Sequence, residues 1–157
     1  MPPPVILLPA QLDLTGVDAD RVAIARFNPQ RHEFQMLDAV VLLDTERMFI
    51  AGYHDVREDA FWVRGHIPGR PLFPGALMIE SAAQLCSYAY AKVSGSQAFL
   101  GFAGVDGVKF RGAVTPPNRF VIIGHVKSIK TRRMISYMQG FVGEEMVFEA
   151  EITGMPV

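Results

Sequence analysis

Cysteine is nearly absent from this chain, and neither sign of charge is in excess. The single Cys86 excludes an intrachain disulfide, which fits a reduced cytoplasmic compartment. The formal net charge is −1, with 15 Lys and Arg against 16 Asp and Glu, so the basic excess of a typical nucleic-acid-binding protein is missing. We therefore expect a cytoplasmic protein that binds no nucleic acid.

The sequence also lacks the features of a secretory leader and of a membrane span. The first ten residues have no basic group, and Pro9 interrupts their short apolar run. Pro71 to Ala91 is the one nearly uncharged stretch that approaches the length of a span, but Glu80 lies near its middle, where lipid would make a carboxylate costly. We expect this stretch to be an internal helix and the protein not to bind membranes.

What is present is enough apolar material for one domain, since half of the 157 residues are hydrophobic. Residues 1–30 are rich in proline and show no sustained period, so we interpret them as an N-terminal extension to a domain at 31–157. Within that domain, alternation and turn residues predict strands at about 36–44, 47–54, 98–103, 107–114, 119–130, 134–142 and 146–153.

One helix is predicted from Pro74-Gly75 to about Val93, after a loop at 65–75 that proline and glycine keep irregular. Apolar residues occupy nearly every face of this helix, and a helix without a polar stripe has to be surrounded. One enclosed helix among many strands predicts an α+β fold, with a curved antiparallel sheet wrapped around the helix.

Glu80 is the only formally charged residue between Arg70 and Lys92. Burial of a carboxylate is costly unless it is paired, hydrogen-bonded or protonated, and burial raises its pKa toward values that suit a proton donor. Gln84, one helical turn later, can hold the carboxylate. A structural ion pair with Arg70 or Arg111 is an equally good interpretation of Glu80 taken alone.

Two further candidates precede Glu80. His66 lies in the loop, where its Gly and Pro neighbours restrict the backbone and place the ring rigidly, as acid/base catalysis requires. Gly75 marks the start of the helix, where free N–H groups can stabilise a carbonyl oxygen that gains negative charge. Taken singly, an ordinary loop histidine and a plain helix start are the better interpretations.

Residues 65–84, GHIPGRPLFPGALMIESAAQ, closely resemble the active-site signature of the β-hydroxyacyl-[acyl-carrier-protein] dehydratases of the FabZ/FabA type. In that family a histidine in a G-H-F-P-like loop precedes P-G-x-L-x-x-E-x-x-A-Q, with the same spacing from histidine to carboxylate. Weaker matches at 30–38 and 104–116 extend the resemblance over roughly residues 30–153. Glutamate rather than aspartate at position 80 favours the branch that dehydrates without isomerising the double bond.

The resemblance implies a hot-dog fold and a hydro-lyase that converts (3R)-3-hydroxyacyl thioesters to trans-2-enoyl thioesters in fatty-acid biosynthesis. It implies that His66 handles the C2 proton, that Glu80 protonates the leaving C3 hydroxyl and that the Gly75 N–H polarises the thioester carbonyl. In the family, His and Glu of one site come from different subunits, which implies a homodimer; hexamers that are trimers of dimers also occur. Residues implied to bind the acyl chain or hold the site are Phe73, Leu77, Gln84 and Phe102.

No metal or bound cofactor is implied, and the thioester is carried by acyl carrier protein or by coenzyme A. Two alternatives stay open at this point. The same fold also occurs in acyl thioesterases, which generally lack the paired His66 and Glu80. A non-catalytic acyl-binding module is the other alternative, although such a module has no need of an isolated buried carboxylate.

Overall fold

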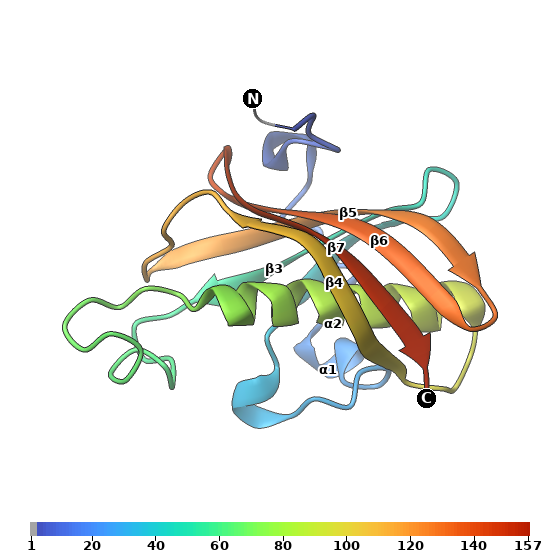
Figure 1. Cartoon of the computed structure of the whole chain (residues 1–157), viewed down its shortest axis with the longest axis horizontal. Coiled ribbons are helices and arrows are strands. Elements are labelled where there is room, and N and C mark those ends of the chain that lie inside the picture. The colour runs from blue at the N-terminus through green and yellow to red at the C-terminus, as the bar shows by residue number, and fades with distance from the viewer. Residues whose placement is uncertain (1–2) are drawn as a thin grey trace.

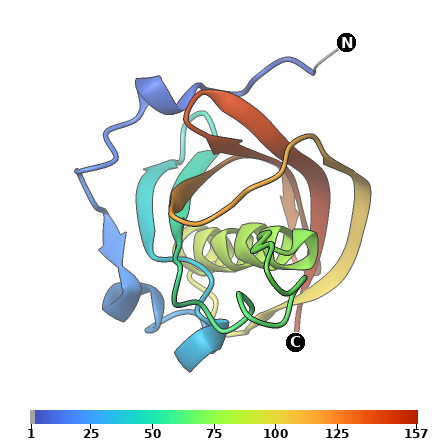
Figure 2. The same ribbon diagram turned by 90° about the vertical axis from the view of Figure 1, so that its left-hand side faces the viewer.

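One long helix lies inside a strongly curved antiparallel sheet. A computed structural model describes residues 3–157, and its elements are labelled in Figure 1. Seven strands form a single sheet in the order β1-β2-β3-β5-β6-β7-β4, and every neighbouring pair is antiparallel. Figure 2, which looks nearly along helix α2, shows the sheet curling around it. The predicted α+β arrangement is therefore confirmed.

Most elements agree with the ranges predicted from the sequence. The strands are β1 (Ala19–Asp20), β2 (Ala39–Asp44), β3 (Phe49–Val56), β4 (Leu100–Phe110), β5 (Asn118–Lys130), β6 (Arg133–Val142) and β7 (Glu145–Pro156). The helices are α1 (Arg21–Ile24), α2 (Gly75–Ser94) and two short 3-10 helices, Pro9–Gln11 and His32–Phe34. The sequence did not predict β1 and α1, because elements of two and four residues carry too little periodicity to be detected.

The prediction of two strands at 98–103 and 107–114 was wrong, because one continuous strand, β4, occupies this region. Its pairing with β7 shifts register between Phe102 and Gly104 and again between Asp106 and Lys109. Gly107 has a φ of +58°, which a glycine adopts without strain. The polar and glycine residues that indicated a break are therefore bulges that bend the strand and keep it paired.

Helix α2 fills the inside of the sheet. It ends at Gly95, whose φ of +65° is the left-handed conformation typical of a helix C-cap. Ala82 and Leu85 are fully buried against the strands, whereas Leu77 and Ile79 nearer the N-terminus are only half-buried. The sheet of one chain therefore leaves part of the N-terminal half of α2 uncovered.

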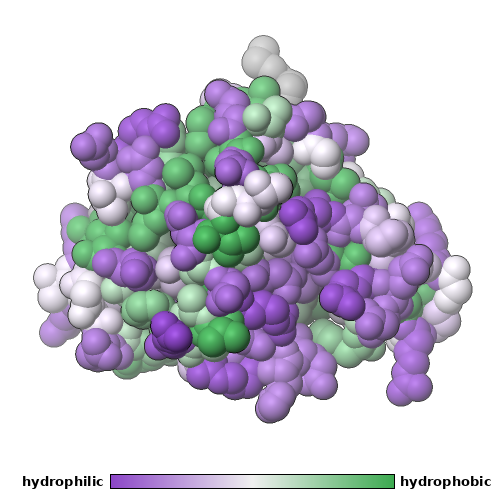
Figure 3. Space-filling view, turned by 180° about the vertical axis from the view of Figure 1, so that it is seen from behind, coloured by the Kyte–Doolittle hydropathy of each residue, from purple (hydrophilic) through white to green (hydrophobic). Residues whose placement is uncertain are grey.

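A second apolar cluster lies on the outer face of the sheet, under the N-terminal segment (Figure 2). Its buried members are Val41, Ala51, Val121, Ile123 and Phe141, and Ile6, Leu7, Leu12 and Leu14 pack against them. The fully buried Gln139 holds the segment, because its Oε1 accepts from the Ile6 N–H at 2.9 Å and its Nε2 donates to the Pro4 carbonyl at 2.9 Å. Figure 3 shows hydrophobic and hydrophilic surface interspersed on the rear face, with hydrophobic surface gathered toward the upper left.

The boundary between an extension at 1–30 and a domain at 31–157 stays a prediction. Within the described residues, β1 from the N-terminal part pairs with β2, so this part contributes to the sheet as well as covering it. Among the helices of residues 3–157, none combines the length and the apolar character needed to cross a membrane.

Candidate active site

Glu80 lies in the N-terminal half of α2 and is held from one turn further along the helix. Gln84 Nε2 donates to Glu80 Oε1 at 2.9 Å, the i to i+4 contact that the spacing predicted. Burial raises the pKa of Glu80 above its ordinary value, and the hydrogen bond from Gln84 lowers it in part. A carboxyl group in this state keeps its proton to higher pH than an exposed glutamate does.

No cation offsets the burial of Glu80 in the part of the chain that the structure describes. Arg111, one of two arginines considered as its partner, pairs with Glu149 at 2.8 Å instead. Arg70, the other, is exposed and forms no ion pair with Glu80. The interpretation of Glu80 as a structural ion-pair residue was therefore wrong for these partners, and its raised pKa follows from burial without a counter-charge.

Gln84 is itself fixed by the segment that precedes β2. Its Nε2 also donates to the Phe34 carbonyl at 2.8 Å, and its Oε1 accepts from the Met36 N–H at 3.0 Å. The Asn28 Nδ2 donates to the Gln84 backbone carbonyl at 2.9 Å. Both amide hydrogens of Gln84 are thus committed to protein groups. These contacts position Glu80, while a direct contact of Gln84 with substrate stays a prediction.

His66 lies in the loop at 57–74 and is half-buried. Its Nδ1 is 2.7 Å from the Leu72 carbonyl, and its backbone N–H donates to the Trp62 carbonyl at 2.7 Å. A carbonyl oxygen only accepts, so Nδ1 carries the hydrogen, and in the neutral ring Nε2 is left with a free lone pair. The loop therefore fixes the orientation of the His66 ring and leaves Nε2 able to accept a proton.

The backbone next to His66 has an unusual conformation. Ile67 has a φ of +61°, in the left-handed region that a β-branched residue rarely enters, and Gly69 has a φ of +78°. Local hydrogen bonds hold the turn, since Arg70 N–H donates to Ile67 O at 2.9 Å and Phe73 N–H to Val114 O at 2.8 Å. Strain of this kind persists where the surrounding structure fixes the backbone, and it is concentrated at functional loops.

Gly75 is the first residue of α2, and Pro74 before it provides no side-chain cap. The N–H of Leu77 donates to the Pro74 carbonyl at 2.9 Å, so the N–H groups of Gly75 and Ala76 are the two that have no backbone or capping partner among the described residues. A Cβ at Gly75 would lie 2.7 Å from two ring atoms of Phe110, so a larger residue would push this ring away. Glycine here keeps the aromatic ring close to the helix N-terminus.

The candidate lining residues separate into two groups. Glu80, Gln84 and Phe102 line one cavity of about 220 Å³ between α2, β4 and β7, and Phe102 is 46% exposed. The full lining of this cavity is Gln30, Glu80, Ala83, Gln84, Cys86, Ser87, Phe99, Leu100, Gly101, Phe102, Ile152, Thr153 and Gly154. The sequence singled out Gln30 only as part of a weak family match, because its side chain reaches the cavity from far along the chain.

The cavity is not lined by the other four candidates, which are Phe73, Leu77, His66 and Gly75. Phe73 is 3% exposed and packs among aromatic rings in the core, with centroids 5.5 Å from Trp62 and 5.8 Å from Phe120. Leu77 is half-buried on the uncovered part of α2. One chain alone therefore places Glu80 in a cavity without placing His66 there.

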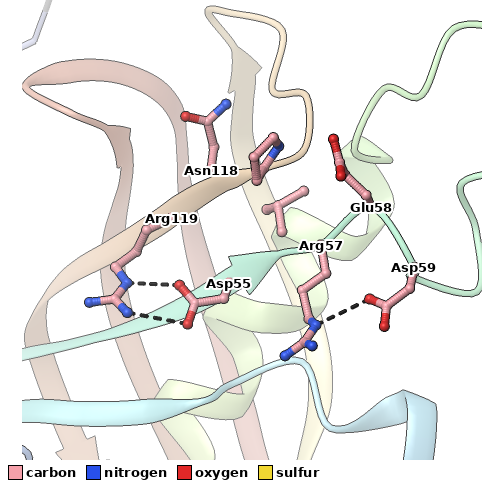
Figure 4. Close-up of a pocket in the computed structure, with 8 residues that line it drawn as sticks. Asp55, Arg57, Glu58, Asp59, Asn118 and Arg119 are labelled. Carbon is pink, nitrogen blue, oxygen red and sulfur yellow. Dashed lines mark hydrogen bonds and ion pairs between the residues drawn. The ribbon is translucent and has the colours of Figure 1, made fainter.

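A larger depression lies elsewhere, where β3 ends and β5 begins, and Figure 4 shows it. It has a volume of about 660 Å³ and is wide open. Four of its five charged groups form two ion pairs, since Arg119 contacts Asp55 at 2.7 and 3.3 Å and Arg57 contacts Asp59 at 3.1 Å, while Glu58 is exposed. The one shifted pKa resolved among these lining residues is that of Arg119, which the hydrogen bond to Asp55 raises, so this guanidinium stays charged and offers no acid or base near neutral pH.

Comparisons with known proteins identify the family of this chain. A family model described as the FabA-like domain matches residues 28–151. A 3-hydroxyacyl-[acyl-carrier-protein] dehydratase FabZ from Desulfotalea psychrophila is 32% identical over 94% of this chain and 95% of its own. One from Pediococcus pentosaceus is 35% identical over 80% of this chain and 84% of its own.

A solved structure supports the fold. The dehydratase heterocomplex ApeI:P from Xenorhabdus doucetiae superposes with a TM-score of 0.72 at 14% identity, covering 85% of this chain and 90% of that chain. Together with the family model and the relatives, this agrees with the hot-dog fold expected from residues 65–84. The chain therefore belongs to the FabA-like family, among relatives that are FabZ-type 3-hydroxyacyl-[acyl-carrier-protein] dehydratases.

Proposed function

We propose that this protein is a hydro-lyase that converts (3R)-3-hydroxyacyl thioesters to trans-2-enoyl thioesters in fatty-acid biosynthesis. One observation carries the proposal: Glu80 is a half-buried carboxyl group with a raised pKa, a glutamine that holds it and no cation beside it among the described residues. A general acid that works near neutral pH needs this environment. The FabZ relatives, named for the same reaction, support the choice of substrate.

The proposed reaction uses three groups. The N–H of Gly75 donates to the thioester carbonyl oxygen, which makes the C2 proton more acidic. His66 Nε2 takes that proton, and the electrons of the C2–H bond form the C2=C3 double bond. The C3–O bond breaks as the oxygen takes the Glu80 proton and leaves as water. Return of one proton from His66 to Glu80, through solvent, restores the starting state.

We propose that the working unit is a homodimer, in which His66 of one chain meets Glu80 of the other. Three features support this. β4 is an edge strand, so one side of its backbone is free to pair. Phe102 and Phe110 on β4 are 46% and 53% exposed, and α2 is uncovered near Ile79. The cavity at Glu80 is also incomplete without a base.

Mixing two inactive variants tests the dimer. His66→Ala and Glu80→Gln chains, unfolded and refolded together in equal amounts, form heterodimers that contain one intact site out of two. Random pairing should restore about a quarter of wild-type activity. No recovery, with heterodimers demonstrated by differential tags, would contradict a site shared between chains.

Acyl carrier protein is the proposed carrier of the thioester, as the names of the relatives state for their own substrates. Arg64 and Arg70 lie in the loop around His66, are exposed and form no ion pair among the described residues. Two free cations next to the reacting groups suit an acidic carrier. Arg111 and Arg119 are less available to a carrier, because they are engaged with Glu149 and Asp55.

A direct assay tests the reaction. The protein is incubated with 3-hydroxybutyryl and crotonyl thioesters of acyl carrier protein, and the enoyl absorbance is followed together with free thiol. Interconversion that is lost in both His66→Ala and Glu80→Gln is the expected result. Thiol release would indicate a thioesterase, and acyl binding without turnover would indicate a binding module.

A further inference from the structure

Gln30 presents a buried oxygen that has no partner. The Oε1 atom of its side chain is inaccessible to solvent and accepts no hydrogen bond from the described residues. Leaving such an acceptor unpaired costs free energy, and a native protein keeps one where something else supplies the donor. The side chain lines the cavity of about 220 Å³ that also contains Glu80.

The backbone around Gln30 is fixed against the helix turn that carries Glu80. Asn28, two residues earlier, donates to the backbone carbonyl of Gln84 at 2.9 Å. The guanidinium of Arg31 donates to the carbonyls of Asn28, Gln30 and Ala25, each at 2.8 Å. The backbone of Gln30 is therefore held in place before any ligand arrives.

The size of the cavity limits what can pair with this oxygen. At about 220 Å³ it is smaller than the roughly 300–1,000 Å³ of most ligand pockets, so a ligand group that reaches Glu80 lies close to Gln30 as well. The substrate of the proposed reaction carries one hydrogen-bond donor between C1 and C3, the hydroxyl on C3. The other polar atoms of this unit are the carbonyl oxygen and the sulfur, which donate nothing.

We propose that Gln30 is a specificity-determining residue that accepts a hydrogen bond from the substrate's 3-hydroxyl group. The hydroxyl oxygen then uses a lone pair to accept from protonated Glu80 while its hydrogen is held by Gln30 Oε1. This orients the leaving group and distinguishes a 3-hydroxyacyl thioester from 3-oxoacyl and saturated thioesters, which have no donor at C3. The assignment rests on the proposed dehydratase function.

The assignment makes an unusual kinetic prediction for Gln30→Met, which keeps the length of the side chain and removes the acceptor. The hydroxyl is present in the 3-hydroxyacyl substrate and in the transition state, and it is absent from the enoyl thioester. For dehydration of 3-hydroxybutyryl-acyl carrier protein, KM should rise about 3- to 10-fold with little change in kcat. For hydration of the crotonyl thioester, kcat should fall by the same factor with little change in KM.

Gln35→Met is the matched control, because Gln35 is on the same segment and does not line the Glu80 cavity. In this control, KM for dehydration and kcat for hydration should both stay close to the values of the unaltered protein. Thermal melting checks that each variant folds. If Gln30→Met does not fold, Gln30→Asn, which withdraws the acceptor by one methylene, should show the same split with a smaller factor.

The outcomes separate this assignment from the function on which it rests. No turnover by the unaltered protein in either direction would overturn the proposed function, and the assignment with it. Turnover by the unaltered protein, with Gln30→Met kinetics unchanged or reduced through kcat in dehydration, would overturn the assignment alone. A general loss of packing would not place the effect on KM in one direction and on kcat in the other.

Discussion

Two partly buried carboxylates of this domain, Glu80 and Asp38, are shifted in opposite directions. Burial alone would raise the pKa of Asp38, but its contacts with the His54 ring, the Asp55 N–H and the Arg21 guanidinium together lower it to about 2. His54 Nδ1 lies 3.0 Å from Asp38 Oδ2, an ion-pair contact more than a well-directed hydrogen bond, and Arg21 lies 2.6 Å from Oδ1. Within residues 3–157, Glu80 is in contact with a glutamine and with no cation, and its pKa is raised.

The difference shows which environment produces an acid and which produces a structural anion. Both side chains lose solvent, so burial does not distinguish them. Arg21 and the hydrogen-bond donors around Asp38 compensate its charge, whereas the neutral amide beside Glu80 compensates only part of the cost of ionisation. A carboxyl group that is buried without a counter-charge keeps its proton to higher pH, and it is therefore the one that can donate a proton near neutral pH.

The largest expected effect is the loss of activity in Glu80→Gln. The substitution keeps the size of the side chain and removes its proton, so dehydration should fall by about 10²- to 10⁴-fold while the fold is kept. Steady-state rates and circular dichroism measure this. Glu33→Gln, on an exposed residue of the nearby segment, is the control and should retain full activity. Equal losses in both variants would contradict the special role of Glu80.

Gln84→Met should have a smaller effect with a distinctive pH dependence. Loss of the hydrogen bond from Gln84 removes an interaction that lowers the pKa of Glu80, so this pKa should rise further. The limb of the pH–rate profile that reports Glu80 should move to higher pH, with activity reduced about 10-fold as residues 34–36 lose their anchor. An unmoved limb in this variant would show that Gln84 does not tune Glu80.

Asp38→Asn should affect stability and leave catalysis nearly intact. Removal of the carboxylate leaves His54 and Arg21 without their partner, so the free energy of unfolding at pH 7 should fall by about 1–3 kcal/mol. The folded pKa of about 2 lies below the ordinary 3.8, so the stabilisation is present above pH 3.8 and is lost as pH falls through 2. Urea unfolding between pH 2 and pH 7 measures both parts. A variant that lost activity as severely as Glu80→Gln would remove the distinction between the two carboxylates.

The smallest expected effect is that of Glu80→Gln on the free energy of unfolding. Whereas Asp38→Asn should lower this free energy, Glu80→Gln should raise it slightly. The pKa of Glu80 is higher in the folded protein than the ordinary 4.5. Above pH 4.5 the unfolded chain therefore ionises more readily than the folded one, and this difference reduces the free energy of unfolding as pH rises. Below pH 4.5 the group is protonated in both states and has no such effect. Because Glu80 is partly exposed, the variant should gain less than about 1 kcal/mol at neutral pH. The gain should vanish at pH 3 in the same urea series. Destabilisation at neutral pH would show that Glu80 is a structural anion after all.

The sequence predicted the fold well where periodicity is long. The range of α2 follows from its nearly continuous apolar residues and from Gly95, and the strands from β5 to β7 follow from turns at Lys130–Arg133 and Gly143. β4 was predicted as two strands because a bulge and a break have the same local composition, and only the pairing with β7 distinguishes them.

The site was predicted in part. His66, Gly75, Glu80 and Gln84 are close in sequence and belong to one contiguous signature, so they could be singled out together. Gln30 reaches the cavity through contacts between residues about 50 positions apart, such as Met36 with Gln84, which no local pattern reports. The packing of Phe73 in the core depends likewise on Phe120 of a distant strand.

Direct titration of Glu80 tests the central claim most closely. Carbon-13 NMR of the side-chain carboxyl groups, with Glu80→Gln to assign the signal, gives the pKa of this group in the folded protein. The account predicts a value clearly above the ordinary 4.5, together with a bell-shaped pH–rate profile that has one limb at that pH. A value at or below 4.5 would contradict the identification of Glu80 as the proton donor.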